Sequence, residues 1–207
     1  MGLPYLALGD SYTIGEGVEP AGRWPMQLAA ALRDIGVAVD DPTIIATTGW
    51  TTDELEAGID ADAPQGPFEL VSLLIGVNDQ YRGRSVDEYR PRFTALLQRA
   101  LAFAGQQRRR VLVLSIPDWG VTPFARENKR DPAQIARELD AYNAAAQAIC
   151  AEHAVAFVDI TAISRERGTE PGMLVDDGLH PSAAMCTEWT RRAFPVVRAH
   201  LDDEAAR

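Results

Sequence analysis

The sequence predicts an α/β fold, namely a three-layer α/β/α sandwich with a central parallel sheet of about five strands, formed by a single domain over residues 1–207. Short runs rich in Val, Ile and Leu alternate with longer amphipathic segments along the chain. The short runs are continuously apolar, as expected of strands that are buried on both faces of a parallel sheet. No repeat, low-complexity tract or Gly/Ser-rich linker divides the chain. A doubly wound sheet is the architecture that this order favours.

The predicted elements alternate between strand and helix from one end of the chain to the other. In chain order they are Pro4–Leu8 (strand), Pro25–Ile35 (helix), Thr43–Ala46 (strand), Thr52–Ala61 (helix), Leu70–Ile75 (strand), Val86–Ala104 (helix), Val111–Ile116 (strand), Pro132–Glu152 (helix), Ala154–Asp159 (strand) and Pro181 to about Leu201 (helix). Each strand candidate is a short apolar run, and each helix candidate has apolar residues at helical spacing. Pro117–Arg130 is left as one long connection and a possible rim of a ligand pocket.

Several of the helix starts are well marked by capping residues. The capping-box pattern of a Ser or Thr followed three residues later by Glu, and the pattern of Asp before Pro, both indicate a first helical turn. These signals are Thr51 with Glu54, Ser85 with Glu88, and Asp131 before Pro132. The last helix is expected to begin at Pro181, which would hold the preceding loop at a rigid helix start.

Composition and charge narrow the class of protein. Hydrophobic residues make up 46% and charged residues 24% of the chain, which is typical of a soluble globular protein rather than a disordered or fibrous one. The net charge of −10 argues against nucleic acid or an anionic membrane as a partner. No apolar run approaches the roughly 20 residues that span a bilayer. The first residues lack the basic start and apolar stretch of a signal peptide, so the cytoplasm is the expected compartment.

Cysteine and histidine are scarce, with two and three copies. This argues against a zinc site built from these residues, and the sequence predicts no cofactor. Cys150 and Cys186 fall in helical patterns and are expected to be buried, reduced thiols. His153 and His200 lie near predicted helix ends, where a histidine interacts favourably with the helix dipole, so both are expected at the surface.

The remaining histidine and one serine could take part in catalysis, although their segments also fit an ordinary turn and a capped turn with an exposed histidine. Ser11 comes directly after the first predicted strand, at the open edge of a parallel sheet where a nucleophile can face a ligand. His180 lies in a loop, and Asp177 three residues earlier can accept a hydrogen bond from one ring nitrogen. The other ring nitrogen would then be free to take the proton of Ser11. Asp10 is expected to shape the turn rather than transfer protons, because a carboxylate beside a nucleophile disfavours its oxyanion.

Two further segments that follow strands carry possible hydrogen-bond donors. The amide of Asn78 can donate to a developing oxyanion, and Gly49 lets its backbone N–H approach a ligand closely. Each segment taken alone is also an ordinary turn between a strand and a helix. The chain has neither a Gly-x-Ser-x-Gly elbow nor a Walker A motif, which weighs against ordinary α/β-hydrolases and P-loop NTPases.

Together these segments resemble the SGNH hydrolases, the GDSL-type esterases and lipases. The matching blocks, in the family's order, are Gly9-Asp10-Ser11, Gly49, Gly76-Val77-Asn78-Asp79 and Asp177-Gly178-Leu179-His180, and Tyr12 departs from the leucine that the family often has. The resemblance implies the flavodoxin-like SGNH fold and a Ser-His-Asp triad of Ser11, His180 and Asp177. It also implies an oxyanion hole of the N–H groups of Ser11 and Gly49 and the amide of Asn78.

The expected substrate is a small-molecule carboxylic ester, with a short- to medium-chain or acetyl acyl group, cleaved through an acyl-enzyme intermediate. A thioesterase or lysophospholipase of the same family and a non-catalytic ligand-binding module on the same fold are the alternatives. A metal-dependent phosphoesterase, with ligands from Asp10, Asp79, Asp118, Asp176 and His180, is a further one. The candidate substrate contacts are Trp50, Tyr81, Trp119, Val121 and Phe124. The natural ester and the oligomeric state are left open.

Overall fold

A computed structural model describes residues 2–205 of the chain. Within these residues the strands form one five-stranded parallel sheet in the order β2-β1-β3-β4-β5. The strands are β1 (Tyr5–Gly9), β2 (Thr43–Ala46), β3 (Leu70–Leu74), β4 (Val111–Leu114) and β5 (Ala156–Val158). All residues of β1, β3 and β4 are buried, including Ser72 of β3, whose hydroxyl is hydrogen-bonded to that of Tyr5. The prediction of an α/β sandwich around a parallel sheet is confirmed.

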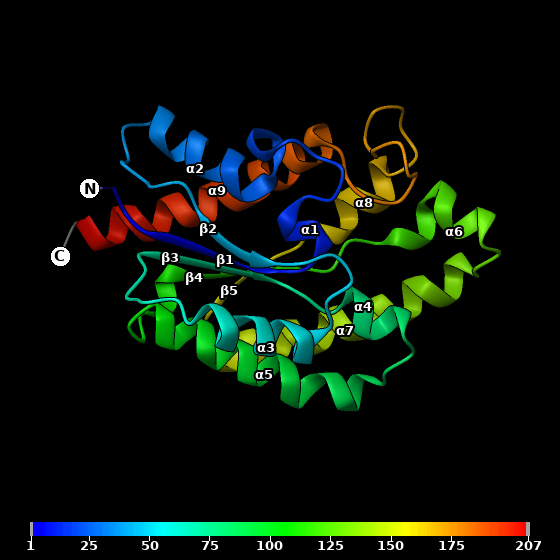
Figure 1. The fold of residues 1–207 in the computed structure, drawn as a ribbon, viewed down its shortest axis with the longest axis horizontal. Helices are drawn as coiled ribbons and strands as arrows, with labels where there is room; N and C mark the ends of the chain where they lie inside the picture. Colours follow the sequence, from blue (N-terminus) through cyan, green and yellow to red (C-terminus); the bar gives the residue numbers. More distant parts are fainter. Residues whose placement is uncertain (1, 206–207) are drawn as a thin grey trace.

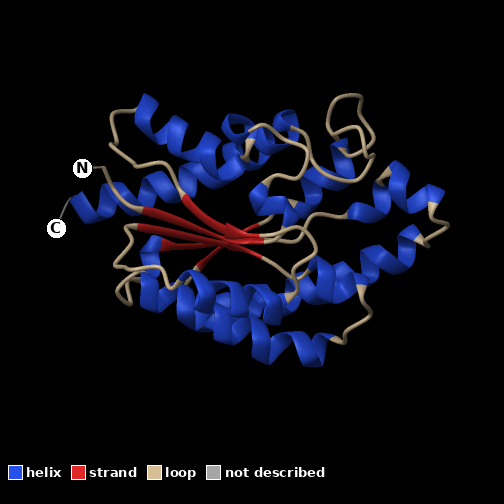
Figure 2. Cartoon of the chain, viewed as in Figure 1, coloured by secondary structure: helices blue, strands red, loops and turns tan. Residues whose placement is uncertain are grey.

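Helices cover both faces of the sheet and complete the three layers (Figure 1, Figure 2). One face is covered by α1 (Ser11–Ile14), α2 (Trp24–Asp34), α8 (Thr161–Arg167) and α9 (Ala183–Ala205). The other is covered by α3 (Thr52–Asp62), α4 (Val77–Tyr81), α5 (Val86–Phe103) and α7 (Pro132–Glu152). The short helix α6 (Pro123–Glu127) lies beyond the carboxyl ends of the strands. No helix among the described residues is long and apolar enough to cross a membrane.

The predicted helix starts on the lower face in Figure 1 are confirmed. Complete capping boxes begin α3 and α5, and Asp131 caps α7 by accepting a hydrogen bond from the N–H of Ala133. Cys150 and Cys186 are free and buried, as predicted, and burial raises the pKa of each thiol to about 12.

The predicted start of the last helix is wrong. Helix α9 begins at Ala183, and the N–H of Cys186 donates to the carbonyl of Ser182. Pro181 lies outside the helix, in an isolated antiparallel bridge with Leu174. The cause is local chemistry, because a serine that can cap the first turn stands directly after the proline. The stretch 117–130 also differs from the expected plain connection, since it contains α6 and a 3₁₀ turn at Trp119–Val121.

The sheet order fixes where a ligand can bind. The chain passes from β1 to β2 on one side and then to β3 on the other side of β1. Such a reversal opens a crevice outside the carboxyl ends of the strands, between β1 and β3. Both termini lie at the opposite end of the sheet in Figure 1. Residues that directly follow β1, β2 and β3 therefore meet at one edge.

Candidate active site

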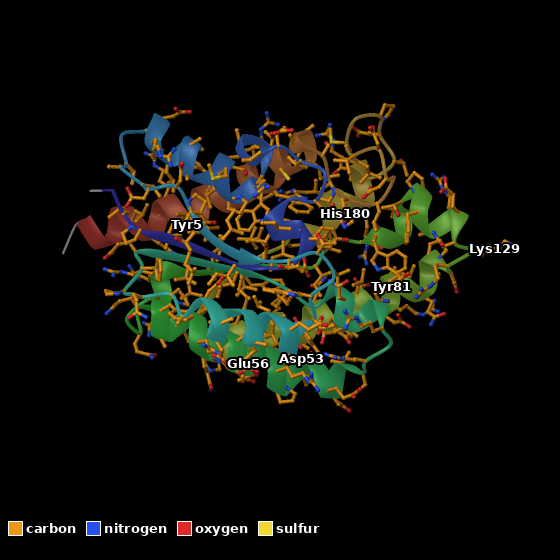
Figure 3. The ribbon with its side chains drawn as sticks, in the orientation of Figure 1. Tyr5, Asp53, Glu56, Tyr81, Lys129 and His180 are labelled. Carbon is orange, nitrogen blue, oxygen red and sulfur yellow. The ribbon has the colours of Figure 1, made fainter. Side chains whose placement is uncertain are left out.

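One cavity at this edge brings together residues from five separate segments of the chain. It has a volume of about 180 Å³ and is mostly apolar. Ser11 follows β1, Gly49 follows β2, Asn78 follows β3, and His180 precedes α9. The other residues that line it are Tyr12, Thr48, Val77, Tyr81, Trp119, Phe124 and Leu179. His180 and Tyr81 lie toward the right-hand end of the molecule in Figure 3, close to the ends of the strands.

Ser11 is presented by the sharp turn that leads from β1 into α1. Asp10 caps this helix, because its Oδ1 accepts a hydrogen bond of 3.0 Å from the N–H of Tyr12. Ser11 is the first residue of α1, so its own N–H has no acceptor within the helix and remains available. The residue is 4% exposed, and its hydroxyl makes no hydrogen bond to any side chain that the structure describes. Both polar groups of Ser11 are thus free to interact with a ligand.

Asp10 is completely buried directly beside Ser11. Its Oδ2 has no hydrogen-bond partner among the described residues. Burial raises the pKa of the Asp10 carboxyl to about 8, the charge of Asp79 adds to this, and the hydrogen bond from Tyr12 partly opposes it. Below that pH the carboxyl is neutral, and it then places no negative charge beside Ser11.

This raised pKa predicts a pH-dependent stability. The folded carboxyl of Asp10 holds its proton more tightly than the unfolded one, so stability falls as the pH rises from about 4 to about 8. Asp10→Asn keeps an acceptor for Tyr12 and cannot ionise. Its free energy of unfolding, measured in urea, should increase relative to that of the wild type as the pH rises through this window. The exposed Asp62→Asn should show no such trend, and a pH-independent difference for Asp10→Asn would contradict the assignment.

His180 is held by Asp177 through a short hydrogen bond. The distance from ring Nδ1 to Oδ2 of Asp177 is 2.6 Å. Oδ1 of Asp177 accepts from the backbone N–H groups of Leu179 and His180 at 2.8 and 2.9 Å. Burial raises the pKa of Asp177, but the hydrogen bonds from the ring and the backbone outweigh it and lower the pKa overall. With Nδ1 as the donor to a carboxylate, the tautomer that we infer leaves Nε2 of His180 unprotonated.

The loop around His180 is fixed by backbone pairing rather than by a helix start at Pro181. The N–H of Val175 donates to the carbonyl of His180 at 2.9 Å, and the N–H of Ser182 donates to the carbonyl of Met173 at 2.9 Å. The ring of Tyr12 stands edge-on to the ring of His180, with 6.2 Å between centroids. Tyr12, the departure from the family pattern, therefore packs against the proposed base.

Two side chains of helix α4 and its C-terminal end, Asn78 and Arg82, hydrogen-bond to the backbone of residues 49 and 50 and so hold Asn78 close to Gly49. Nδ2 of Asn78 donates to the carbonyl of Trp50 at 2.9 Å, which uses one of the two amide hydrogens and leaves the other free. Nη2 of Arg82 donates to the carbonyl of Gly49 at 2.8 Å. Gly49 has a φ of 88°, a region that glycine adopts readily, and a Cβ there would meet open space. The role of Arg82 was not predicted from the sequence.

Asp79 links the segment of Asn78 to the segment that follows β2 through hydrogen bonds to Thr52. It is fully buried and accepts from the N–H of Thr52 at 2.9 Å, from its hydroxyl at 2.8 Å, and from Nη1 of Arg84 at 2.9 Å. The carboxylate thus anchors the first turn of α3 to α4. Sequence reasoning placed Asp79 in the Gly-x-Asn-Asp block and among the possible metal ligands, but assigned it no structural partner. Nothing in the sequence around Asp79 indicates that it pairs with Thr52, which is 27 residues away along the chain.

The residues of the metal-site alternative do not gather in one place. Asp118 pairs with Nε of Arg165 at 2.8 Å, and Asp79 is held as described above. Among residues 2–205, no three His, Cys, Asp or Glu side chains are arranged to hold a metal ion. His153 caps α7, and its Nδ1 lies 2.9 Å from the carbonyl of Ile149.

Of the predicted substrate contacts, the cavity includes Tyr81, Trp119 and Phe124 but not Trp50 or Val121. The indole of Trp50 packs on Gly58 of α3, where a Cβ would lie only 2.2 Å from the ring. Val121 lines a smaller neighbouring cavity. Both residues follow strand ends as expected, but their side chains point into the packing of nearby elements.

The five-stranded parallel sheet with helices on both faces is the fold of the SGNH hydrolases, a class of enzymes that cleave acyl esters. The model of the GDSL-like lipase/acylhydrolase family matches residues 7–186, and the chain belongs to this family. It is therefore a carboxylic ester hydrolase. No curated protein matches the chain in sequence.

Solved structures with the same fold cover almost the whole chain. The crystal structure of TesA has a TM-score of 0.74 at 22% identity and covers 95% of this chain and 99% of its own. A psychrotrophic esterase, EstA from Pseudoalteromonas sp., has a TM-score of 0.73 at 16% identity, with 96% and 98% covered. Axe2, an acetylxylan esterase from Geobacillus stearothermophilus, has a TM-score of 0.68 at 22% identity, with 95% and 94% covered.

Proposed function

We propose that this esterase acts through a Ser-His-Asp triad, in which Ser11 is the nucleophile, His180 the base and then the acid, and Asp177 the residue that orients His180. The observation that carries the proposal is that Ser11 and His180 line the same cavity. Nδ1 of His180 is hydrogen-bonded to Oδ2 of Asp177 at 2.6 Å. Ser11 Oγ attacks the acyl carbonyl while Nε2 of His180 takes its proton. His180 then protonates the leaving oxygen, and water hydrolyses the acyl-enzyme in a second step.

The tetrahedral intermediates need donors aimed at the oxyanion. The free N–H of Ser11, the N–H of Gly49 and the second amide hydrogen of Asn78 all belong to residues that line the cavity. Because Asn78 and Gly49 are held through the carbonyls of residues 50 and 49, little reorganisation is needed when charge develops. This arrangement favours catalysis by transition-state stabilisation.

Asn78→Ala should lower kcat by about 10²–10³-fold, the usual effect of losing one oxyanion donor. KM should change little, because the oxyanion forms only during the reaction. Asn128→Ala is the matched control, since the Asn128 amide also donates to a carbonyl, that of Phe124 at 2.9 Å, but does not line the cavity. Turnover by Asn78→Ala equal to that of the wild type would remove Asn78 from the mechanism.

The size of the cavity favours a short acyl group. A cavity of about 180 Å³ is comparable to engineered cavities of about 150 Å³ that bind benzene. We therefore expect kcat/KM for 4-nitrophenyl esters to be highest for acyl chains of about two to eight carbons and to fall for longer ones. Dialysis against EDTA should leave the rates unchanged. A preference for long chains would overturn the size argument, and loss of activity in EDTA would favour the metal-dependent alternative.

A thioesterase or lysophospholipase activity uses the same residues and differs in the leaving group. Matched oxygen and thiol esters of one acyl group, compared by kcat/KM, distinguish these activities. A non-catalytic binding module would hydrolyse none of them. The cytoplasm remains the compartment predicted from the sequence.

A further inference from the structure

Arg130 lies on two aromatic side chains of the catalytic cavity. Its guanidinium carbon is 5.1 Å from the centroid of the Tyr81 ring and 5.1 Å from that of the Trp119 ring. The two rings lie 5.4 Å apart, and both line the cavity together with Ser11 and His180. The cation is therefore held against the cavity lining rather than extended freely into solvent.

The inner of the two rings, that of Trp119, is fixed in place by hydrogen bonds. Nε1 of Trp119 donates to Oε1 of Gln80 at 2.9 Å, and Nε2 of Gln80 donates to Oε2 of Glu138 at 2.6 Å. Trp119 is 2% exposed, whereas Tyr81 is 45% exposed and forms the outer side of the stack. Arg130 thus packs on an aromatic platform at the outer side of the cavity, in which Trp119 is anchored and Tyr81 is exposed.

No carboxylate pairs with Arg130 among the described side chains. The acidic groups close to it in sequence are engaged elsewhere or exposed, since Asp131 caps α7 and Glu127 lies on the surface. Glu138, behind the platform, is held by the amides of Gln80 and Gln134. Arg82 and Arg84, on the same side of the sheet, both have acidic partners. An unpaired cation next to the catalytic cavity is notable in a chain of net charge −10.

A guanidinium that stacks on aromatic rings keeps its N–H groups free along its edge. Those groups match two oxygens of a carboxylate or phosphate, and such charge-assisted pairs are stronger than neutral hydrogen bonds. The exposed Arg126 and Lys129 add positive charge to the same short segment. This makes the segment locally basic, although the acidity of the whole chain disfavours anionic ligands.

We propose that Arg130 is an anion-recognition residue of the catalytic cavity, and that the preferred substrates are esters that carry a carboxylate or phosphate away from the scissile bond. The proposal rests on the proposed function, because it names the substrate class of that same cavity. Arg130 takes no part in bond breaking and acts by binding the charged end of the substrate.

The test uses two pairs of esters that differ in charge. For a carboxylate on the acyl side, mono(4-nitrophenyl) adipate is compared with its neutral methyl ester. For a phosphate on the leaving group, 4-acetoxyphenyl phosphate is compared with its neutral dimethyl ester, in which both ionisable phosphate oxygens are methylated. The measured quantity is the ratio of kcat/KM between the anionic and the neutral member, so that intrinsic reactivity cancels when variants are compared. In at least one pair, Arg130→Gln should lower this ratio by about tenfold or more relative to the wild type.

Two further variants test whether Arg130 binds the anionic group of the substrate directly. The alternatives are that it only supports the rings of Tyr81 and Trp119, or only adds positive charge near the cavity. Arg126→Gln removes the same charge from an exposed position in the same segment and should leave the ratio within about twofold. Arg130→Lys keeps the charge without the planar fork and should give an intermediate ratio. Equal losses of kcat/KM for the anionic and neutral esters in Arg130→Gln would mean that Arg130 only supports Tyr81 and Trp119, which would overturn the proposal.

A binding measurement distinguishes failure of this inference from failure of the proposed function. Calorimetric titration of Ser11→Ala with the two anionic esters, and of Ser11→Ala/Arg130→Gln with the same esters, does not depend on turnover. Weaker binding by the double variant supports Arg130 even if the wild type hydrolyses none of the four esters. Equal binding by both variants, with normal hydrolysis by the wild type, would contradict the inference and leave the esterase mechanism intact.

Discussion

Ser11→Ala should lower kcat for 4-nitrophenyl acetate by about 10⁶-fold, the loss seen when a serine hydrolase loses its nucleophile. The reason is that Ser11 is the serine among the residues that line the cavity, whereas the hydroxyl of Thr48, which also lines it, donates to the carboxylate of Glu16. The fold should survive, because the Ser11 hydroxyl makes no hydrogen bond to a described side chain. Circular dichroism and the thermal midpoint check this.

Labelling with a fluorophosphonate probe gives an independent readout of the same prediction. The wild type should be labelled and Ser11→Ala should not, because the probe reacts with an activated serine. Ser182→Ala is the matched control, since Ser182 lies two residues after His180 but serves the backbone: its hydroxyl donates to the carbonyl of Gly172 at 2.5 Å. Undiminished labelling of Ser11→Ala would show that another residue is the nucleophile.

Asp177→Asn should lower kcat by about 10⁴-fold, as for the same change in a Ser-His-Asp triad. The asparagine Oδ1 can still accept from the N–H groups of Leu179 and His180, so the loop keeps its shape. Its NH₂ group, however, replaces the oxygen that faces Nδ1 of His180. Two donors cannot bond, so the ring takes the tautomer whose Nε2 is protonated and cannot accept the proton of Ser11.

The neighbouring Asp176 provides a close control for this substitution. It is exposed and precedes Asp177 in the same loop, so Asp176→Asn removes the same charge without touching His180. Its kcat should stay within about twofold of the wild type. If Asp176→Asn loses as much activity as Asp177→Asn, the general charge of the loop is responsible and not the pairing with His180.

The parts of the site that follow strands were accessible from the sequence. Apolar runs locate the strands, and parallel strands bring the residues after them to one edge, so the meeting of Ser11, Gly49 and Asn78 follows from the pattern. His180 was found through its short-range relation to Asp177, which the structure contains as a hydrogen bond. These relations need only local spacing and the sheet topology.

The parts that depend on distant pairing were not accessible. Arg82, Arg130 and Asp79 act through partners such as the carbonyl of Gly49, the Trp119 ring and Thr52, which lie on other elements. The short helices α1, α4, α6 and α8 were missed because one or two turns have too few residues to show helical periodicity. Trp50 was wrongly expected in the cavity. It follows a strand, but position after a strand does not fix the direction of a side chain.

The position of the cavity between segments from both halves of the chain has a consequence for synthesis on the ribosome. Ser11 is made together with the central strand β1, before the neighbouring strand β3 and well before the loop of His180. A nascent chain therefore carries the nucleophile without a base beside it until the segment of His180 has been made. Under the proposed mechanism, hydrolysis begins only once that segment has folded against β1, so a shorter nascent chain cannot act on cellular esters.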